Sequence, residues 1–340
     1  MWAQKSRAQR SIRHRNVLIV GGAGYIGSHT TLALNAAGYT TVVYDNFLSG
    51  HRDACFGTHL VEGDLADTPT LVETMRTYKI DCVVHFAALI EAGQSVITPL
   101  PFFENNVSGS LSLLRAMQEA GVMRIVFSST AAVYGNQTGT GTLSEDLPRA
   151  PINPYGDSKA MIETVLESCV EAHGLQAIAL RYFNACGADP EGRTGERHDP
   201  ETHLIPLVIQ AARGIRPHIK IYGTDYDTPD GTCIRDYIHV CDLATGHVAA
   251  VKHLCAMDAP MFRPINLGTG EGLSVREVID AVAKISGRPF DVIETARRSG
   301  DPATLVADPQ AAHDLLDWHA THSSIEQIVQ TAWDYAERPL

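Results

Sequence analysis

The segment V17-L-I-V-G21-G-A-G24-Y-I-G27 determines the fold class of this chain. An apolar run typical of a buried β-strand leads directly into a turn with glycines at every third position. In such a turn Gly21 permits the tight bend, Gly24 lets the backbone approach a pyrophosphate, and Gly27 lets the next helix pack close to the strand. The helix N-terminus would offer free N–H groups to the phosphates. Because the segment follows the first strand and begins the first helix, it predicts a dinucleotide site.

Strand and helix patterns alternate from this segment through the first half of the chain. The predicted strands are almost continuously apolar, which is typical of parallel strands buried on both faces. They cover Asn16–Val20, Thr40–Tyr44, His59–Glu62, Asp81–Phe86, Arg124–Ser128 and Leu175–Arg181. Helical patterns lie between them, including Gly24–Ala37, Val107–Ala120 and Ser158–His173. This alternation predicts an α/β fold with a Rossmann-type, doubly wound parallel sheet.

The alternation ends after Asn184, which indicates a second part of the chain. Residues Gly187–His203 are rich in glycine, proline and charge and predict a long loop, a kind of segment that is often functional. Further elements are predicted at Leu204–Arg213, Ile219–Tyr222, Pro264–Leu267, Ser274–Ser286 and Ser323–Ala336, with a helix from His239 or Val240. We expect residues 16–185 to bind the cofactor, with 236–269 returning to that domain, and 186–340 to form mainly a smaller C-terminal substrate-binding lobe.

Composition and charge exclude several classes of protein. The 340 residues are 44% hydrophobic and 19% charged, which is ordinary for a globular protein. No apolar run in the sequence approaches the ~18 residues that span a bilayer. A net charge of −12 disfavours binding to nucleic acid or to anionic membranes. We therefore expect a small-molecule substrate and neither nucleic acid nor a membrane as partner.

Residues 1–15 and the cysteines bear on the compartment. The first 15 residues carry basic side chains and no acidic one, and they lack the apolar core of a secretory signal. We expect a disordered extension or a misplaced start codon, with an organelle presequence as the weaker alternative. The seven cysteines form no C-x-x-C pair and the histidines no H-E-x-x-H motif, so neither a disulfide framework nor a metal site is expected. A cytoplasmic location fits this cysteine usage.

Asp45, at the end of the second predicted strand, indicates which cofactor is bound. A carboxylate at this position accepts hydrogen bonds from the adenosine ribose and repels a 2′-phosphate, which favours NAD over NADP. Asn46 follows it directly. Asp64 follows the third strand and is a candidate contact to the adenine edge, although the Gly63–Asp64 pair is also common in turns.

Tyr155 and Lys159, in the motif N153-P-Y-G-D-S-K159, predict the chemistry. Residues four apart share one face of a helix, so the lysine would lie beside the tyrosine. A nearby ammonium group and a positive nicotinamide ring both favour the phenolate form of a tyrosine, which otherwise titrates near ~10. Thr130, at the carboxyl end of the preceding strand, could hydrogen-bond the reacting oxygen. Together these residues predict a nicotinamide enzyme with a tyrosine acid/base.

Further blocks of sequence carry a resemblance to a known family. They are H85-F-A-A88, N105-N106-V, S128-S-T-A-A-V-Y-G135, R181-Y-F-N184, G231-T-C-I-R-D-Y-I-H239 and R297-R-S-G-D301. With the motifs above, they make residues 16–337 resemble the nucleotide-sugar 4-epimerases of the extended short-chain dehydrogenase/reductase family. The resemblance implies an isomerase that interconverts UDP-glucose and UDP-galactose with tightly bound NAD. In such enzymes the tyrosine removes the proton of the sugar 4-hydroxyl, carbon 4 is oxidised to a ketone, and reduction from the opposite face follows.

The resemblance also implies the residues of the site. The catalytic residues would be Tyr155, Lys159 and Thr130. The cofactor would be bound by Gly21, Gly24, Tyr25, Ile26, Gly27, Asp45, Asn46, Asp64, Leu65, Phe86, Ala87, Ala88, Asn105, Ser128, Tyr155, Lys159 and Phe183. The UDP-sugar would be bound by Thr130, Tyr155, Asn184, His203, Leu204, Tyr222, Arg235, Arg298, Asp301 and Leu305. Arginine forks suit a diphosphate, and an aromatic ring at Tyr222 could contact uracil.

Three positions depart from the pattern of this family. His203 stands where an asparagine is common, and Ile90 stands where a lysine near the cofactor is frequent. Leu305 stands where a bulky tyrosine can restrict the space beside the sugar. Because leucine is smaller, we expect some tolerance for 2-acetamido sugars.

Other functions were weighed against sugar 4-epimerisation. A UDP-pentose 4-epimerase would use the same residues and stays open as the main alternative. A 4,6-dehydratase needs acidic groups directly after Thr130, where this chain has Ala131 and Ala132. A non-catalytic NAD-binding protein would not need Tyr155 and Lys159 in this arrangement. The resemblance further implies a homodimer, formed through the helices predicted near Val107–Ala120 and Ser158–His173.

Overall fold

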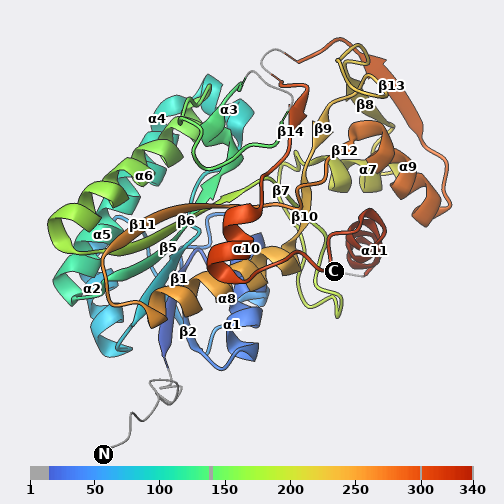
Figure 1. Ribbon diagram of the computed structural model, residues 1–340. Coiled ribbons are helices and arrows are strands. Elements are labelled where there is room, and N and C mark those ends of the chain that lie inside the picture. The colour runs from blue at the N-terminus through green and yellow to red at the C-terminus, as the bar shows by residue number, and fades with distance from the viewer. Residues whose placement is uncertain (1–14, 138–140, 299–300, 339–340) are drawn as a thin grey trace, which may run out of the picture.

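The centre of the fold is a seven-stranded parallel sheet with the strand order β11-β6-β5-β4-β1-β2-β3 (Figure 1). The computed structural model describes residues 15–137, 141–298 and 301–338, so the extension expected over residues 1–15 lies outside the described residues except for Arg15. The strands are β1 (Asn16–Val20), β2 (Thr40–Asp45), β3 (His59–Glu62), β4 (Cys82–His85), β5 (Arg124–Thr130), β6 (Gln176–Tyr182) and β11 (Met261–Leu267). The predicted Rossmann-type α/β fold is confirmed.

Helices cover both faces of this sheet. One face packs against α2 (Thr68–Thr77), α5 (Gly109–Ala120) and α6 (Pro154–His173). The other packs against α1 (Tyr25–Ala36), α8 (Val240–Ala256) and α10 (Gln310–Leu316). Within β1, Leu18 and Val20 belong to the first core, and Val17 and Ile19 belong to the second. The strand is continuously apolar because both of its faces are buried.

The start of α6 follows from its sequence. The Asn153 side chain accepts a hydrogen bond from the backbone N–H of Gly156 at 2.9 Å, and Pro154 occupies the first turn. An asparagine cap followed by proline is a strong signal for a helix start, because the capped N–H groups have no partner within the helix. The helix ends at Gly174, which has a left-handed backbone with φ of 73°. This cap fixes where Tyr155 enters the site.

Several predicted elements of the first half differ from the structure at their ends. Strand β5 continues to Thr130, two residues beyond the predicted Ser128, and α6 starts at Pro154, four residues before the predicted Ser158. The helix predicted from Val107 begins inside a π-helical turn (Phe103–Ser108), which follows α3 (Ala92–Ile97) and α4 (Pro99–Phe102), and it continues as α5 from Gly109. The strand predicted at Asp81–Phe86 is shorter by one residue at each end. Short 3₁₀ turns occur at Arg52–Ala54 and Ala131–Tyr134.

A third hydrophobic core lies beyond β7, to the right of the main sheet in Figure 1. It is formed by α7 (Leu204–Ala212), α9 (Val275–Ser286), α11 (Ile325–Ala336) and a sheet of β8 (His218–Tyr222) with β13 (Asp291–Thr295). Residues 187–203 form a long irregular segment before α7, as predicted. Small sheets pair β7 (Asn184–Cys186) with β10 (Tyr237–His239), and β9 (Ile234–Arg235) with β12 (Leu273–Ser274) and β14 (Thr304–Leu305).

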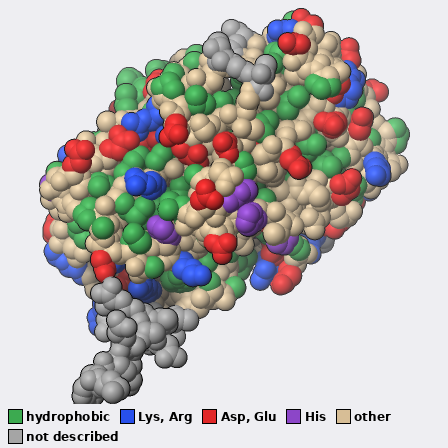
Figure 2. Space-filling model, viewed as in Figure 1, with side chains coloured by type: hydrophobic (Ala, Val, Ile, Leu, Met, Phe, Trp, Pro, Cys, Tyr) green, Lys and Arg blue, Asp and Glu red, His purple; other side chains and the backbone are tan. Residues whose placement is uncertain are grey.

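The chain returns to the main sheet between β10 and β12. Strand β11 pairs with β6 along its whole length, from Met261 opposite Gln176 to Leu267 opposite Tyr182. No helix in the described part of the chain is long and apolar enough to cross a membrane. Figure 2 shows acidic and basic side chains interspersed with apolar ones over the described residues of one face.

Candidate active site

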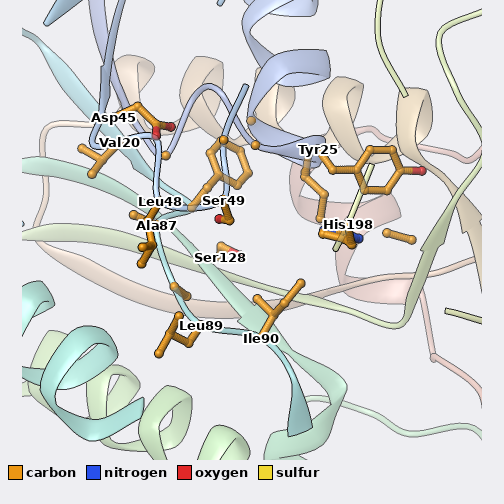
Figure 3. A pocket seen from close by; sticks show the side chains of 18 of the residues that line it. Val20, Tyr25, Asp45, Leu48, Ser49, Ala87, Leu89, Ile90, Ser128 and His198 are labelled. Carbon is orange, nitrogen blue, oxygen red and sulfur yellow. The ribbon is translucent and has the colours of Figure 1, made fainter. Parts of the chain in front are cut away.

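A cavity of about 310 Å³ lies at the carboxyl ends of the central strands (Figure 3). It opens where the strand order reverses between β1 and β4, which is where open α/β sheets bind their ligands. Figure 3 shows Asp45 and Val20 at one end of this cavity and Tyr25 and His198 at the other. The volume lies at the lower end of the range for small-molecule sites, which is roughly 300–1,000 Å³.

The glycine turn between β1 and α1 forms one wall of the cavity. Gly21 has a φ of 82°, and a Cβ atom there would lie 2.5 Å from the backbone nitrogen of Ala87. A Cβ at Gly27 would lie 2.2 Å from the carbonyl oxygen of Gly21, so only glycine lets the helix approach this closely. At Gly24, by contrast, the nearest atom would be 3.5 Å away. The turn therefore has room at Gly24 for a phosphate group in front of the N-terminus of α1.

Asp45 is held in place by backbone groups. Its Oδ2 accepts a hydrogen bond from the Ala23 N–H at 2.9 Å, and its Oδ1 accepts one from the Phe47 N–H at 2.8 Å. The carboxylate lines the cavity although the residue is only 7% exposed. Each carboxylate oxygen can accept a further hydrogen bond. The structure therefore presents an oriented acceptor pair that suits a ribose diol.

Asp64 does not line the cavity, whereas its neighbours Gly63 and Leu65 do. Its Oδ2 accepts a hydrogen bond from the side-chain amide of Asn46 at 2.8 Å, and its Oδ1 accepts one from the Ala66 N–H at 2.9 Å. The carboxylate orients Asn46, which is a lining residue. In the described geometry Asp64 therefore positions the side chain of Asn46.

Tyr155 and Thr130 both line the cavity, and Lys159 lies behind them. The Lys159 side chain is buried, donates a hydrogen bond from Nζ to the Ser128 carbonyl oxygen at 2.7 Å, and lies 4.9 Å from the centre of the Phe127 ring. The lysine is therefore tied to Ser128 near the end of β5, two residues before Thr130.

The pKa values of the pair are set mainly by burial. Burial raises the pKa of Tyr155 to about 12, against a lowering by the Thr130 hydroxyl and with a further rise from the Glu91 carboxylate. Burial lowers the pKa of Lys159 to about 7. The protein groups alone therefore do not produce the lowered tyrosine pKa expected from the sequence. A lowered pKa of Tyr155 is therefore expected only with the positive nicotinamide ring bound and with Lys159 in its charged form.

A buried ion pair fixes α6 against β5 and β6. Arg181 donates hydrogen bonds from Nη2 to Glu163 Oε2 at 2.6 Å and from Nε to Glu163 Oε1 at 3.0 Å. The Ser129 hydroxyl donates to Glu163 Oε1 at 2.6 Å. Glu163 lies one helical turn after Lys159 and is fully buried. This pair was not predicted, and the only sequence signal for it is an acidic residue on the same helix face as the tyrosine and lysine.

The residues expected to bind the uridine diphosphate form two groups. Asn184 and His203 line the cavity. The second group lies in the lobe beyond it, where the Arg298 guanidinium stands 3.8 Å above the Tyr222 ring and Arg235 lies 3.8 Å from Asp301. Its remaining members do not line the cavity either: they are Leu204, at the start of α7, and Leu305, in β14.

Arg297 and Arg298 are neighbours in the chain, but they have different partners. Arg297 donates to Asp225 Oδ1 at 2.7 Å and stands 4.1 Å above the Tyr226 ring, so its charge is already paired. Among the described residues no ion pair is recorded for Arg298, which covers Tyr222 instead. Arg298 is therefore the better candidate to meet an anionic ligand.

His203 lies between two carboxylates. Its Nδ1 is 2.7 Å from Glu196 Oε1 and 3.2 Å from Glu201 Oε1. Burial alone would lower the pKa of His203, but the hydrogen bonds to Glu196 and Glu201 raise it to about 10. In the absence of a bound ion, His203 therefore holds its proton between these two carboxylates.

The cavity brings most of the predicted cofactor residues together. The predicted residues that line it are Gly21, Gly24, Tyr25, Ile26, Gly27, Asp45, Asn46, Leu65, Phe86, Ala87, Ala88, Asn105, Ser128, Thr130, Tyr155, Phe183, Asn184 and His203. Lining residues that were not predicted include Leu48, Ser49, Gly50, Leu89, Ser129, Tyr182, Ala185, Glu196 and His198. Most of these lie one to five residues from a predicted one, so proximity along the chain was the signal for them.

Comparison with known proteins defines the class of protein. Residues 17–268 match the model of the NAD-dependent epimerase/dehydratase family, and the chain belongs to this family. The UDP-glucose 4-epimerase of Rhizobium meliloti is 47% identical over 327 residues, which cover 96% of this chain and 98% of the relative.

Two solved structures are similar along nearly the whole chain. A UDP-glucose 4-epimerase from Stenotrophomonas maltophila, with bound NAD and formylated UDP-arabinopyranose, superimposes with a TM-score of 0.91 at 38% identity and covers 95% of this chain and 98% of that one. The UDP-Glc/GlcNAc 4-epimerase of Campylobacter jejuni superimposes with a TM-score of 0.83 at 39% identity and covers 94% and 98%.

Proposed function

We propose that this protein is an NAD-dependent isomerase that interconverts UDP-glucose and UDP-galactose at carbon 4 of the sugar. The observation that carries the proposal is the placement of Tyr155 and Thr130 on the wall of a cavity whose other wall is the glycine turn. A UDP-glucose 4-epimerase at 47% identity over nearly the full length supports the same function. After Thr130 come Ala131 and Ala132, which carry no group for the proton transfers of an elimination.

The described residues fit NAD. The space at Gly24, the N-terminus of α1 and the oriented Asp45 carboxylate suit a pyrophosphate and an adenosine ribose without a 2′-phosphate. We assign cofactor contacts to the lining residues of the glycine turn, to Asp45 and Asn46, and to the segment after β4. When bound, NAD supplies the redox chemistry, since it accepts a hydride from carbon 4 of the sugar and later gives it back.

The side chains of the chain itself handle the proton. Tyr155 removes the proton from the sugar 4-hydroxyl and returns it to the same oxygen. The Thr130 hydroxyl hydrogen-bonds that oxygen and holds it toward Tyr155. Lys159, fixed by the Ser128 carbonyl, stabilises the phenolate form of Tyr155 whenever it carries its positive charge.

The lobe anchors the nucleotide while the sugar turns. Arg235 and Arg298 would hold the diphosphate, and Tyr222 would contact the uracil ring. Asn184 and His203 line the cavity and would also contact the sugar nucleotide. Because the charged contacts are made to the diphosphate and few contacts are made to the sugar, the oxidised sugar can turn and present its opposite face to the cofactor.

Purified protein incubated with UDP-galactose should form UDP-glucose without added NAD. The expected result follows from a cofactor that ends each cycle in the form in which it began. Product formation would be measured by chromatography, and bound NAD by its release on denaturation. Folded protein that contains NAD but forms no UDP-glucose would contradict the proposed function.

Replacement of Lys159 by alanine should lower turnover most strongly at low pH. A lysine with a pKa of about 7 is charged below that pH and loses its charge above it, so its support for the Tyr155 phenolate fades as the pH rises. The ratio of wild-type to variant turnover should therefore fall between pH values of about 6 and about 9, with the rising limb of the variant profile displaced upward. A ratio independent of pH would exclude this role.

Leu305→Tyr should reduce the use of 2-acetamido sugars more than that of hexoses. Leu305 and Phe183 pack against the same small core, which contains Val133 and Tyr134 directly after the Thr130 strand. A larger side chain there would take space beside the sugar, where an N-acetyl group has to fit. Comparison of kcat/KM for UDP-N-acetylglucosamine and UDP-glucose would measure the change. If wild-type enzyme at high concentration does not turn over UDP-N-acetylglucosamine, the tolerance expected from Leu305 is wrong.

A UDP-pentose 4-epimerase is the second candidate. A structure at 38% identity holds a formylated UDP-arabinopyranose, which supports keeping it open. A pentose lacks only the substituent at carbon 5, so the same tyrosine and threonine would serve. A panel of UDP-glucose, UDP-N-acetylglucosamine and UDP-xylose under identical conditions separates the candidates by their kcat/KM values.

We also propose how the chain divides into domains and that two chains form a homodimer. Residues 16–185, with the returning part of 236–269, would form the NAD domain, and most of 186–340 the UDP-sugar lobe, which has a hydrophobic core of its own. Exposed apolar side chains at Val96, Ile97 and Leu100 lie near α6 and favour a homodimer on that side. All seven cysteines are free thiols, which supports a cytoplasmic location. Sedimentation velocity would test the dimer.

A further inference from the structure

Metal-ligating side chains meet on the irregular segment between β7 and α7. Glu196, His198, Glu201 and His203 each place one donor atom within 4.8 Å of the others. The Nδ1 atoms of both histidines converge on Glu196 Oε1, at 3.1 Å from His198 and 2.7 Å from His203. We propose that this set of residues, called the Glu–His cluster below, binds one divalent cation of the zinc class.

The distances within the cluster suit tetrahedral coordination. Zinc binds histidine nitrogen and carboxylate oxygen at about 2.0–2.2 Å, which places neighbouring ligand atoms of a tetrahedron about 3.4 Å apart. The three donor distances in the cluster run from 2.7 to 3.2 Å. These three pairs would separate by a few tenths of an ångström to admit the ion, and the remaining pairs, which lie within 4.8 Å, would close around it. Two imidazoles with two carboxylates favour zinc over magnesium or calcium, which prefer six or more oxygen ligands.

Burial and charge support the same assignment. The side chains of Glu196 and Glu201 are only 6% and 7% exposed, so two negative charges are withdrawn from water at one point. Buried charges in proteins are paired or bind metals. A dication would displace the proton of His203, and with two neutral imidazoles it balances the two carboxylates. Glu201 Oε1 also accepts hydrogen bonds from the backbone N–H groups of Thr202 and His203, at 2.7 and 2.8 Å. These hydrogen bonds hold the carboxylate in place, as outer-shell partners do for a metal ligand.

The position of the cluster indicates what the ion would do. Glu196, His198 and His203 line the same cavity as the glycine turn, and the His198 ring lies 6.2 Å from that of Tyr25 (Figure 3). All four ligands come from one stretch of eight residues, so the ion would fasten this part of the cavity wall. Four protein ligands leave no open coordination position, which is the pattern of a structural and not of a catalytic zinc. The inference therefore goes beyond the proposed function and does not depend on it.

Calorimetric titration with zinc tests the proposal directly. Full-length protein without a polyhistidine tag, treated with a chelator, should bind one zinc ion per chain and unfold at a higher temperature with zinc than without it. His198→Gln and Glu201→Gln should each weaken the affinity by at least ~10-fold and abolish the shift in unfolding temperature. Two variants at different ligands guard against one that fails to fold.

A second pair of histidines provides the matched control. His313 and His319 have ring centres 4.2 Å apart, and neither belongs to the Glu–His cluster. The double variant His313→Gln/His319→Gln should still bind one zinc ion with wild-type affinity. The proposal is overturned if wild-type protein binds no stoichiometric zinc, or if the zinc site is lost in this control and kept in both cluster variants.

Discussion

Replacing Tyr155 by phenylalanine should lower turnover of UDP-galactose by ~100-fold or more, which is the range of a positioned acid/base. The variant loses only a hydroxyl group, and the ring that lines the cavity remains. Without that hydroxyl, neither the removal of the proton from the sugar oxygen nor its return has a carrier. Because binding contacts in the lobe are untouched, KM should change far less than kcat. Single-turnover and steady-state rates at saturating substrate would measure the effect.

The control for this variant is the removal of a tyrosine hydroxyl elsewhere. Tyr39 is half-buried against the core on the α1 face and does not line the cavity. Tyr39→Phe should keep wild-type turnover, and both variants should keep the wild-type content of NAD. If Tyr155→Phe retained the wild-type rate, the tyrosine would have no part in the proton transfer.

Glu163→Gln should lower the free energy of unfolding by ~3–5 kcal/mol, because it leaves the buried guanidinium of Arg181 without a charged partner. Glu163 is fully buried and accepts hydrogen bonds from Arg181 and Ser129. The ion pair joins α6 to β5 and β6, so its loss should also loosen the helix that carries Tyr155 and Lys159. Urea denaturation would measure the stability, and the pH profile of turnover would report the displaced pair.

The same helix supplies the matched control. Glu167 lies one turn further along α6, pairs with Arg149 at 3.0 Å, and has a side chain that is 40% exposed. Glu167→Gln should cost only ~0–1 kcal/mol, as surface ion pairs do. The double variant Glu163→Leu/Arg181→Leu should be more stable than Glu163→Gln, because both buried charges are removed together. Equal losses for Glu163→Gln and Glu167→Gln would show that burial of the pair is not what matters.

The sheet could be predicted because its strands are long and buried on both faces. The interiors of β1, β2 and β6 are apolar, at 17–20, 42–44 and 177–180, and the glycine turn indicated where the first βα unit starts. The strands of two or three residues, such as β9 and β14, could not be predicted, since so few residues show no periodicity. The π-helical turn before α5 was missed for a similar reason, because its sequence follows an ordinary helical pattern.

The residues of the candidate site likewise fall into those that the sequence predicted and those that it did not. Asp45 ends β2, and Ser128 and Thr130 lie at the end of β5. Parallel strands bring their carboxyl ends to one edge, so the sequence alone predicted that these residues meet at the cavity. Partners that depend on tertiary packing could not be predicted in this way. Glu163 and Arg181 meet because a helix crosses two strands, and Glu196 faces His203 because an irregular segment folds back on itself.

During synthesis, the edge of the sheet at β6 is protected only after β11 has been made and has paired with it. Its partner β6 ends at Tyr182, whereas β11 is complete only at Leu267, 85 residues later in the numbering. At a translation rate of about 5–20 residues per second, the ribosome needs roughly 4–17 s to add that stretch. During this interval β6 presents unpaired backbone N–H and C=O groups, which can template pairing with another chain. Nascent chains that stall between these two strands should therefore be the species most prone to aggregate and the main clients of chaperones.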